Sequence, residues 1–465
     1  MRTRLQSIWD GLRSSYWFIP TLMAIFAVAM SLLAREIDQR YPETIETILP
    51  ESAMAGPDGA REMLSTIAGS TITVAGVAFS ILIVALSNAS SQFGPRILRI
   101  YMQDTGSQIV LGTFTSTFLY CLVVLRTVRG TEDDQFVPHL SVTVGLVLAL
   151  AGIGVLIYFL HHSASLIHIS NITARIGTEL QDSISTVFPE EIGEPLETTV
   201  EIDDIDLEGA AISEYLPPDE AMTVSGSDSG YIQAIEQERI LDVAVKHDLI
   251  IQIVSRPGMF VVPGAIYAQF WTRGEHGEGE QISAAVRKAF IIGAQRTSIQ
   301  EIEIFFDELI EIALRALSPS INDPYTAMTV VDWLSGALST MVRRTPPSPF
   351  RYDRQGTLRV IAEPRTSIEF IDRVFDQIRD SAISHPMVLL GLLEMAIVVA
   401  TRTSNAQQRE ALSRQAGIIA RIATDHESYA PHIRDALLNK HREVVEVLTA
   451  GDRARARVRV AEDVG

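Results

Sequence analysis

Four long stretches without Asp, Glu, Lys or Arg dominate the first 175 residues of the chain. They cover residues 14–34, 63–95, 105–125 and 135–174. A helix of about 20 apolar residues crosses a hydrocarbon core about 30 Å thick, and a charge at its centre costs about 2.5–3.5 kcal/mol. Core helices of soluble proteins seldom run this long without a charged face. The pattern therefore predicts four transmembrane helices, near 17–34, 67–87, 107–125 and 140–160.

The residues before the first apolar stretch indicate the orientation in the membrane. Arg2, Arg4 and Arg13 precede it, and no small-residue cleavage site ends a short apolar segment, so we expect a retained anchor. Basic residues favour the cytoplasmic side, and an even number of spans returns the chain to that side. We therefore expect a multi-pass protein of the cell (inner) membrane, embedded in the lipid bilayer, with both termini in the cytoplasm.

Small and hydroxylated residues recur at helical spacing within the second span. They form one narrow stripe, which comprises Gly69, Thr73, Gly76, Ser80 and Ser87. Thr113 and Thr117 add hydroxyl groups to the third span. Such residues let helices approach closely and hydrogen-bond across the contact, and the same surface would suit the lining of a water-filled pore. The chemistry favours helix packing and leaves the pore open as an alternative.

Three histidines follow the fourth span, at His161, His162 and His168. Histidine changes charge near neutral pH and is a common metal ligand, so these residues are candidates for a pH-sensing or metal site. A histidine at the membrane surface more commonly forms a hydrogen bond with lipid or neighbouring backbone. We favour that interpretation and keep a pH or metal site as the alternative.

Most of the net negative charge lies between the apolar stretches and the rest of the chain. The protein has 38 Lys and Arg against 57 Asp and Glu, a formal net charge of −19. Between residues 189 and 228 there are thirteen acidic residues, four prolines and no basic residue. Such a composition favours a solvated spacer. We expect a four-helix transmembrane domain with a helical extension over 1–180 and an acidic linker over 181–228.

The remaining residues have the pattern of a mixed α+β region. Short apolar segments around 230–235, 249–254 and 259–271, with one helix among them, predict a small α+β domain over 229–275. Longer helical periodicity predicts a mainly helical cytoplasmic domain over 276–465. The expected fold class is an α-helical integral membrane protein with four transmembrane helices and a C-terminal mixed α+β, mainly helical, cytoplasmic domain.

Two of these predicted helices have distinctive surfaces. The helix over 299–317 places Glu303, Asp307 and Glu311 on one face, which we interpret as a solvated face, with cation binding as the weaker alternative. The segment 387–400 is apolar except for one glutamate. It is too short to span a bilayer, so we expect a buried helix that contributes to a subunit or domain contact.

A polar turn follows the first of these helices. Asp323 and Pro324 form an N-cap and first-turn pair, because the carboxylate accepts free backbone amides and proline has no amide to lose. One helix end and one helix start meet at this turn, which would suit a ligand. The side chains available to it are Ser318, Ser320, Asn322, Asp323 and Thr326. We favour a structural turn over a binding site.

The turn also carries a resemblance to a known family. The run Ile-Ala-Leu-Arg-Ala-Leu-Ser-Pro-Ser-Ile-Asn-Asp-Pro-Tyr-Thr-Ala over 312–327 resembles the signature of bacterial predicted membrane proteins in the domain-of-unknown-function 2254 family. Further matches lie at 229–235, Arg256-Pro257-Gly258, 260–261, Arg296-Thr297 and His161-His162. This chain departs from the family pattern at Met259, Glu301 and Ser320. The resemblance implies four amino-terminal spans and a large cytoplasmic domain, and it implies no activity.

The sequence narrows the possible functions by exclusion. One cysteine, Cys121, cannot form an intramolecular disulfide, and the acidic balance argues against a nucleic-acid partner. No phosphate loop, zinc-protease motif, nucleophile elbow or dinucleotide fingerprint is present, so we expect neither an enzyme nor a cofactor. Two interpretations remain. We favour a homo-oligomeric channel or transport protein gated by its cytoplasmic domain, and the alternative is a membrane-anchored scaffold that recruits cytoplasmic partners.

Overall fold

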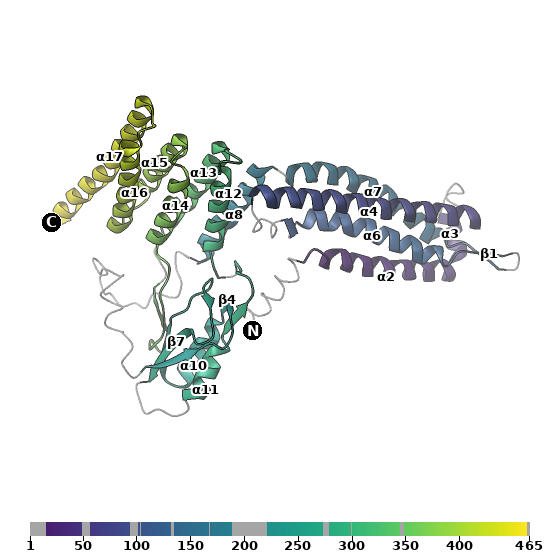
Figure 1. Cartoon of the computed structure of the whole chain (residues 1–465). Coiled ribbons are helices and arrows are strands. Elements are labelled where there is room, and N and C mark those ends of the chain that lie inside the picture. The colour runs from purple at the N-terminus through teal and green to yellow at the C-terminus, as the bar shows by residue number, and fades with distance from the viewer. Residues whose placement is uncertain are drawn as a thin grey trace. The chain divides into compact units, whose positions relative to one another are not determined.

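The chain forms two compact units, residues 4–172 and a second unit formed chiefly by residues 173–465. The computed structural model describes residues 15–48, 56–93, 101–102, 104–131, 134–166, 168–187, 221–272, 279–298, 300–344 and 348–462. We call the two parts the N-terminal unit and the C-terminal unit and describe each by itself (Figure 1). The three arginines before the first span and most of the expected acidic linker lie outside the described residues.

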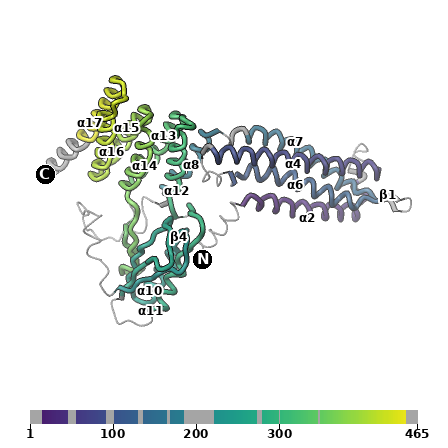
Figure 2. The backbone as a smooth tube through the Cα atoms, in the orientation of Figure 1, coloured from purple at the N-terminus to yellow at the C-terminus, as the bar shows by residue number. Residues whose placement is uncertain are grey.

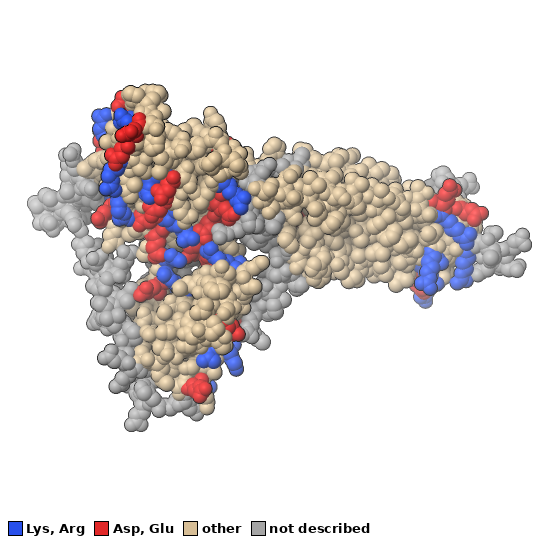
Figure 3. All heavy atoms as spheres, viewed as in Figure 1, with Lys and Arg blue, Asp and Glu red and all other residues tan. Residues whose placement is uncertain are grey.

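Long helices build the N-terminal unit. They are α2 (Phe18–Arg40), α4 (Pro57–Phe93), α6 (Thr105–Leu125) and α7 (His139–Leu166). Each is long and apolar enough to cross a membrane, so the structure confirms the four helices expected from the apolar stretches. The face seen in Figure 3 shows no charged side chain along most of this unit, and the charges gather at one end. The short elements between the long helices are α3 (Pro42–Ile48), β1 (Arg129–Thr131) and β2 (Asp134–Phe136).

Helix α6 lies at the centre of this unit and packs against α2, α4 and α7. The last turn of α2 also holds the start of α7. The Asp38 carboxylate accepts hydrogen bonds from the backbone amides of Leu140 and Ser141 at 2.9 and 3.0 Å and from the Ser141 hydroxyl at 2.6 Å. A carboxylate at this position satisfies amides that have no partner inside the helix. Asp38 therefore caps α7 from a different helix.

Two sheets form the α+β part of the C-terminal unit. The strands are β3 (Met222–Ser225), β4 (Gly230–Ile235), β5 (Leu249–Ile253), β6 (Phe260–Val261), β7 (Ile266–Thr272), β8 (Phe290–Gly293), β9 (Phe350–Tyr352) and β10 (Leu358–Ala362). One sheet has the order β3-β7-β5-β10-β9 and the other the order β6-β4-β8. Helices α10 (Gln237–Lys246) and α11 (Gly279–Arg287) pack on strands of the first sheet and share one hydrophobic core with both sheets.

This α+β part draws on more of the chain than the expected range 229–275. Strand β3 comes from the range assigned to the acidic linker, and β8, β9 and β10 come from the range assigned to the helical domain. Strand β10 pairs in parallel with β5, although Val360 and its partner Ile251 are far apart in the sequence. Such non-local pairing leaves no periodic signal by which it could be recognised in the sequence.

Helices stacked in pairs form the rest of the C-terminal unit (Figure 2). The pairs are α12 (Glu303–Ala316) with α13 (Pro324–Met341), α14 (Ser367–Ser381) with α15 (Pro386–Ala400), and α16 (Ala406–Asp425) with α17 (Pro431–Glu462). One row contains α12, α14 and α16, and a second row contains α13, α15 and α17. Near the start of the second row, Gly177 of α8 (Ile169–Val187) lies directly against the Trp333 indole of α13.

Helix α15 is the apolar segment expected to contribute to a subunit or domain contact. It is buried as expected, but its neighbours α13, α16 and α17 belong to the same chain. Leu389, Leu392, Leu393 and Ala396 are fully buried there. The apolar surface of α15 therefore stabilises the helix stack itself.

Candidate functional sites

The stripe predicted in the second span lies on the outer face of α4. Gly69, Thr73, Gly76, Ser80 and Ser87 are all exposed. A Cβ atom added at Gly69 or Gly76 would meet nothing within 4 Å. The hydroxyls of Thr73 and Ser80 donate to the backbone oxygens of Gly69 and Gly76 at 2.8 and 2.9 Å. The stripe is thus a smooth surface that no other part of the described N-terminal unit covers.

The opposite face of α4 packs inside the unit. Its buried positions there are mainly small, namely Ala60, Ala68, Ala75, Ala78, Ala85 and Ala89. Thr113 and Thr117, the hydroxyl residues of α6, donate to the backbone oxygens of Ile109 and Thr113 at 2.8 Å. Thr117 is fully buried in the bundle. The structure therefore does not join the two predicted sets into one surface, because the α4 stripe faces outward and Thr117 faces inward.

The three predicted histidines have different surroundings. His162 Nε2 lies 2.8 Å from Asp104 Oδ2, and its ring stacks on Tyr158 with 5.1 Å between the ring centroids. His161 and His168 are exposed. Among the residues that the structure describes, no group of three or more His, Cys, Asp or Glu side chains is placed to hold a metal ion. The geometry thus gives His162 a carboxylate partner.

The predicted ligand turn at 318–326 is organised around Asp323. Its Oδ1 accepts hydrogen bonds from the backbone amides of Tyr325 and Thr326, both at 3.1 Å, and its Oδ2 accepts one from the Thr326 hydroxyl at 2.6 Å. The hydroxyls of Ser318 and Ser320 lie 3.2 Å apart. Asn322 has a φ of 53°, a left-handed conformation that asparagine tolerates better than most residues. Asp323 therefore acts as the N-cap of α13.

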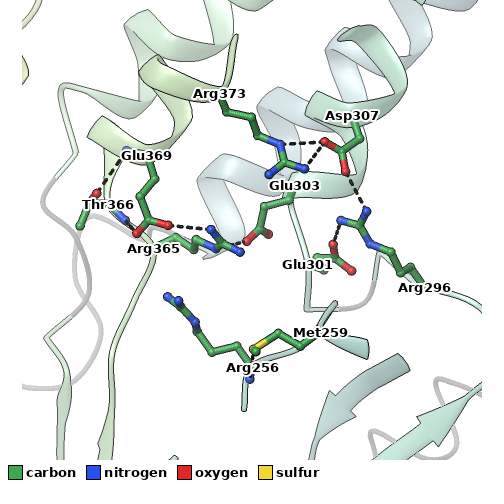
Figure 4. Close-up of polar contacts among 10 residues, drawn as sticks. All are labelled: Arg256, Met259, Arg296, Glu301, Glu303, Asp307, Arg365, Thr366, Glu369 and Arg373. Carbon is green, nitrogen blue, oxygen red and sulfur yellow. Dashed lines mark hydrogen bonds and ion pairs between the residues drawn. The ribbon is translucent and has the colours of Figure 1, made fainter. Parts of the chain in front are cut away.

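A cluster of ion pairs that the sequence did not reveal lies around the start of α12 (Figure 4). We call it the α12 ion-pair cluster. It comprises Arg296, Glu301, Glu303, Asp307, Arg365, Glu369 and Arg373. Arg296 pairs with Glu301 and, at 2.7 Å, with Asp307. Arg373 Nε donates to Asp307 at 2.8 Å. The cluster joins the loop after β8 to α12 and α14.

The acidic face of α12 is therefore not a solvated face, which corrects the expectation for Glu303 and Asp307. Their exposed fractions are 8% and 7%. Arg365 Nε lies 2.7 Å from Glu303 and its Nη1 lies 2.6 Å from Glu369. Glu311 is more accessible and pairs with Arg315 one turn later. The interpretation failed because the arginines that cover this face come from other segments of the chain.

The loop that carries Arg296 and Glu301 is also attached to strand β4. The side-chain amide of Gln300 donates to the backbone oxygen of Ile235 at 3.1 Å, and its oxygen accepts from the Ile235 amide at 2.8 Å. The Thr297 hydroxyl donates to the Gln233 backbone oxygen at 3.1 Å. Gln300 therefore forms the two hydrogen bonds that a neighbouring strand residue would form. The loop connects the α+β part firmly to the helix stack.

Gly258 completes this attachment from the other side. It has a φ of 86°, and a Cβ atom there would overlap the Glu301 carboxyl group. Only glycine combines this backbone conformation with so close an approach. Two segments that resemble the family pattern meet at Glu301. Gly258 of Arg256-Pro257-Gly258 lies against the Glu301 carboxyl group, and Arg296 of Arg296-Thr297 pairs with it. These two matches were the sequence signal for this site.

The charges of the α12 ion-pair cluster are set by burial and by their partners. Burial acts to lower the pKa of the Arg296 guanidinium, but the hydrogen bonds and charges of Glu301 and Asp307 outweigh burial and raise it. Burial raises the pKa of Glu303 despite the opposing charge of Arg365. Arginine remains charged in either case. The cluster is thus a set of charge-assisted contacts between segments.

Comparisons with known proteins agree with this architecture. The family model described as "Predicted membrane protein (DUF2254)" matches residues 13–397. Similar proteins include the uncharacterized protein Rv1290c of Mycobacterium tuberculosis and the uncharacterized protein Mb1321c of Mycobacterium bovis. Each is 31% identical over 427 residues, which is 91% of this chain and 79% of the relative. No solved structure matches. The chain therefore belongs to the DUF2254 family of predicted membrane proteins.

Proposed function

We propose that the protein is a homo-oligomeric channel or transport protein of the cell (inner) membrane whose subunits meet along the α4 stripe. Its termini lie in the cytoplasm, and the C-terminal unit gates the path. The observation that supports this proposal is the open face of α4, where glycines and hydroxyl residues line a surface that is uncovered in the single subunit. A surface of this kind at bilayer depth suits another helix or water better than lipid chains.

The stripe would offer a passing ion or water molecule weak, uncharged ligands. The hydroxyls of Thr73 and Ser80 are bonded to their own helix, so their oxygens still have a free lone pair for a passing ion or water. Gly69 and Gly76 leave room for neighbouring helices or for a hydrated path. Large apolar side chains flank the stripe, including Ile72, Val77, Ile83 and Val84, all exposed. Flanking side chains of this kind would seal the contact between adjacent subunits.

Cysteine cross-linking tests the arrangement of the subunits. The chain has one cysteine, buried Cys121, so C121A gives a clean background. Thr73→Cys and Ser80→Cys in that background should form disulfide-linked dimers in native membranes. The matched control is Leu150→Cys on α7, which is 60% exposed and also lies within a span. A protein that stays monomeric in the membrane, or cross-links equally at position 150, would show that the subunits do not meet along the α4 stripe.

Ion flux into liposomes tests conduction. Gly76→Leu or Ser80→Leu should abolish the flux while the oligomer, measured by chemical cross-linking of surface amines, persists. Leu150→Ala on the outer face of α7 should leave the flux unchanged. Thiol reagents that cannot cross membranes should react with cysteine at 73 or 80 if water reaches the stripe.

A membrane-anchored scaffold is the second candidate function. The row of stacked helix pairs from α12 to α17 favours it, because stacked helical pairs present extended surfaces that bind other proteins. Oligomers that cross-link along α4 but carry no flux would favour the scaffold. We propose no enzymatic activity, no cofactor and no nucleic-acid partner for either function.

A further inference from the structure

A contact between a histidine and a carboxylate joins two distant segments at an end of the N-terminal unit. His162 belongs to the last turns of α7, and Asp104 directly precedes α6. His162 Nε2 lies 2.8 Å from Asp104 Oδ2, with side-chain exposed fractions of 21% and 9%. The pair is therefore largely shielded from water, where a change of charge has a larger effect than at an open surface.

The surroundings hold the imidazole in place. Tyr158 stacks on it at an interplanar angle of 15°. A Cβ atom at Gly106 would lie 2.6 Å from His162 Nε2 and 2.8 Å from the Tyr158 hydroxyl, so only glycine allows the ring to approach α6 this closely. The same Asp104 oxygen accepts the Ser107 amide at 2.8 Å. Asp104 thus caps α6 and binds α7 at once.

Histidine is the side chain whose charge ordinarily changes between pH 5 and 8, and His162 is the histidine of this contact. Burial acts to raise the pKa of Asp104, but hydrogen bonds from Ser107 and His162 outweigh it and hold that pKa below its usual value. Asp104 therefore stays ionised in this range. Burial, with the charge of Asp104 adding to it, raises the pKa of Tyr16 to about 12, and burial raises that of Tyr101 to about 12. Both phenols remain neutral.

The two protonation states of His162 then give two different contacts. A neutral imidazole leaves the carboxylate of Asp104 with a full negative charge in a shielded position. A protonated imidazole neutralises it, and its charge is also favoured near the carboxyl end of α7. A charge-assisted hydrogen bond is about twice as strong as a neutral one. A protonated His162 therefore holds the two helices together more strongly than a neutral one.

We propose that His162 and Asp104 form a proton-controlled latch, which holds the end of α7 against the start of α6 when His162 is protonated and loosens when it is neutral. The latch depends on the contact within one unit and on no particular function of the α4 stripe. It gives the protein a way to sense the pH of the compartment that this end of the unit faces.

Hydrogen exchange of the full chain in nanodiscs tests the latch. After correction for intrinsic rates, amides over 158–166 should be about fivefold better protected at pH 5.5 than at pH 8, as expected for a gain of about 1 kcal/mol. His162→Gln keeps a hydrogen-bond donor but cannot titrate, so it should lose this pH dependence. Asp104→Asn still caps α6 but carries no charge, and it should lose the dependence too.

His161→Gln is the matched control, because His161 is the adjacent, exposed histidine. It should keep the full pH dependence. The proposal is overturned if the wild-type protection does not change with pH, if His162→Gln changes as much as the wild type, or if His161→Gln abolishes the change.

Discussion

Arg296 Nη1 lies 2.7 Å from Asp307 Oδ2, which ties the loop after β8 to the second turn of α12. Asp307 also accepts from Arg373 of α14, so one buried carboxylate serves two arginines from segments far apart in the chain. Removing one member of a buried ion pair is costly because it leaves an uncompensated charge. Asp307 is therefore the residue on which the α12 ion-pair cluster most depends.

Asp307→Asn should destabilise the C-terminal unit by about 3 kcal/mol, because in this shielded site Arg373 loses its carboxylate partner and Arg296 keeps only Glu301. The measurement is chemical denaturation followed by tryptophan fluorescence. Replacing Trp9 and Trp17 by Phe leaves Trp271 and Trp333 to report on the C-terminal unit alone.

Glu311→Gln on the same helix is the control for Asp307. Its partner Arg315 is one turn away and the pair is partly exposed, so the loss should be about 0.5 kcal/mol or less. Equal losses for the two variants would show that the buried cluster contributes no more than a surface pair.

The second prediction concerns Gly258, which lies against the Glu301 carboxyl group. Gly258→Ala combines a left-handed backbone with a collision against the Glu301 carboxyl group. Gly264→Ala has nearly the same φ, 88°, but the added methyl group would meet open space. Gly264→Ala should therefore cost about 1 kcal/mol from backbone strain alone, and Gly258→Ala clearly more.

The comparison of the two glycine variants separates strain from contact. Thermal denaturation of both variants in the two-tryptophan background provides the measurement. If Gly258→Ala were no worse than Gly264→Ala, the close approach of Gly258 to Glu301 would not matter for stability.

The third prediction concerns pH and Glu303. Burial raises the pKa of Glu303 above the ordinary value of 4.5, so the folded chain holds this proton more tightly than the unfolded chain. The stability from this group is complete below pH 4.5 and declines as pH rises through the raised pKa of the folded state. Glu303→Gln cannot ionise and should escape this decline, while Arg365 keeps Glu369 as its partner at 2.6 Å.

Denaturation at a series of pH values between 4 and 7 measures the effect. The free energy of unfolding of Glu303→Gln, relative to the wild type, should improve as the pH rises above 4.5 and level off once Glu303 is ionised in the folded wild type. A relative free energy that stays constant or falls would mean that Arg365 fully compensates the burial of Glu303.

These sites show which structural features can be predicted from the sequence. The four spans follow from unbroken apolar length, and the start of α13 follows from Asp323 and Pro324, because both signals are local. The burial of Asp307 is not local, since its partner Arg373 lies on another helix. The periodicity of the α4 stripe could be predicted from the sequence. The outward direction of Gly69 and Gly76 could not, because it depends on which side of α4 packs against the other helices.

The capping role of Asp323 leads to the last prediction. Asp323→Ala should cost about 1–2 kcal/mol, because the amides of Tyr325 and Thr326 lose their acceptor. Asn405→Ala provides the matched comparison, since Asn405 caps α16 in the same way through the amides of Gln407 and Gln408. Asp323→Asn should be nearly neutral, because asparagine is an equally good cap. If Asp323→Asn instead cost as much as Asp323→Ala, the second carboxylate oxygen, which accepts from the Thr326 hydroxyl, and the negative charge at the helix start would contribute as much as the acceptor for the backbone amides.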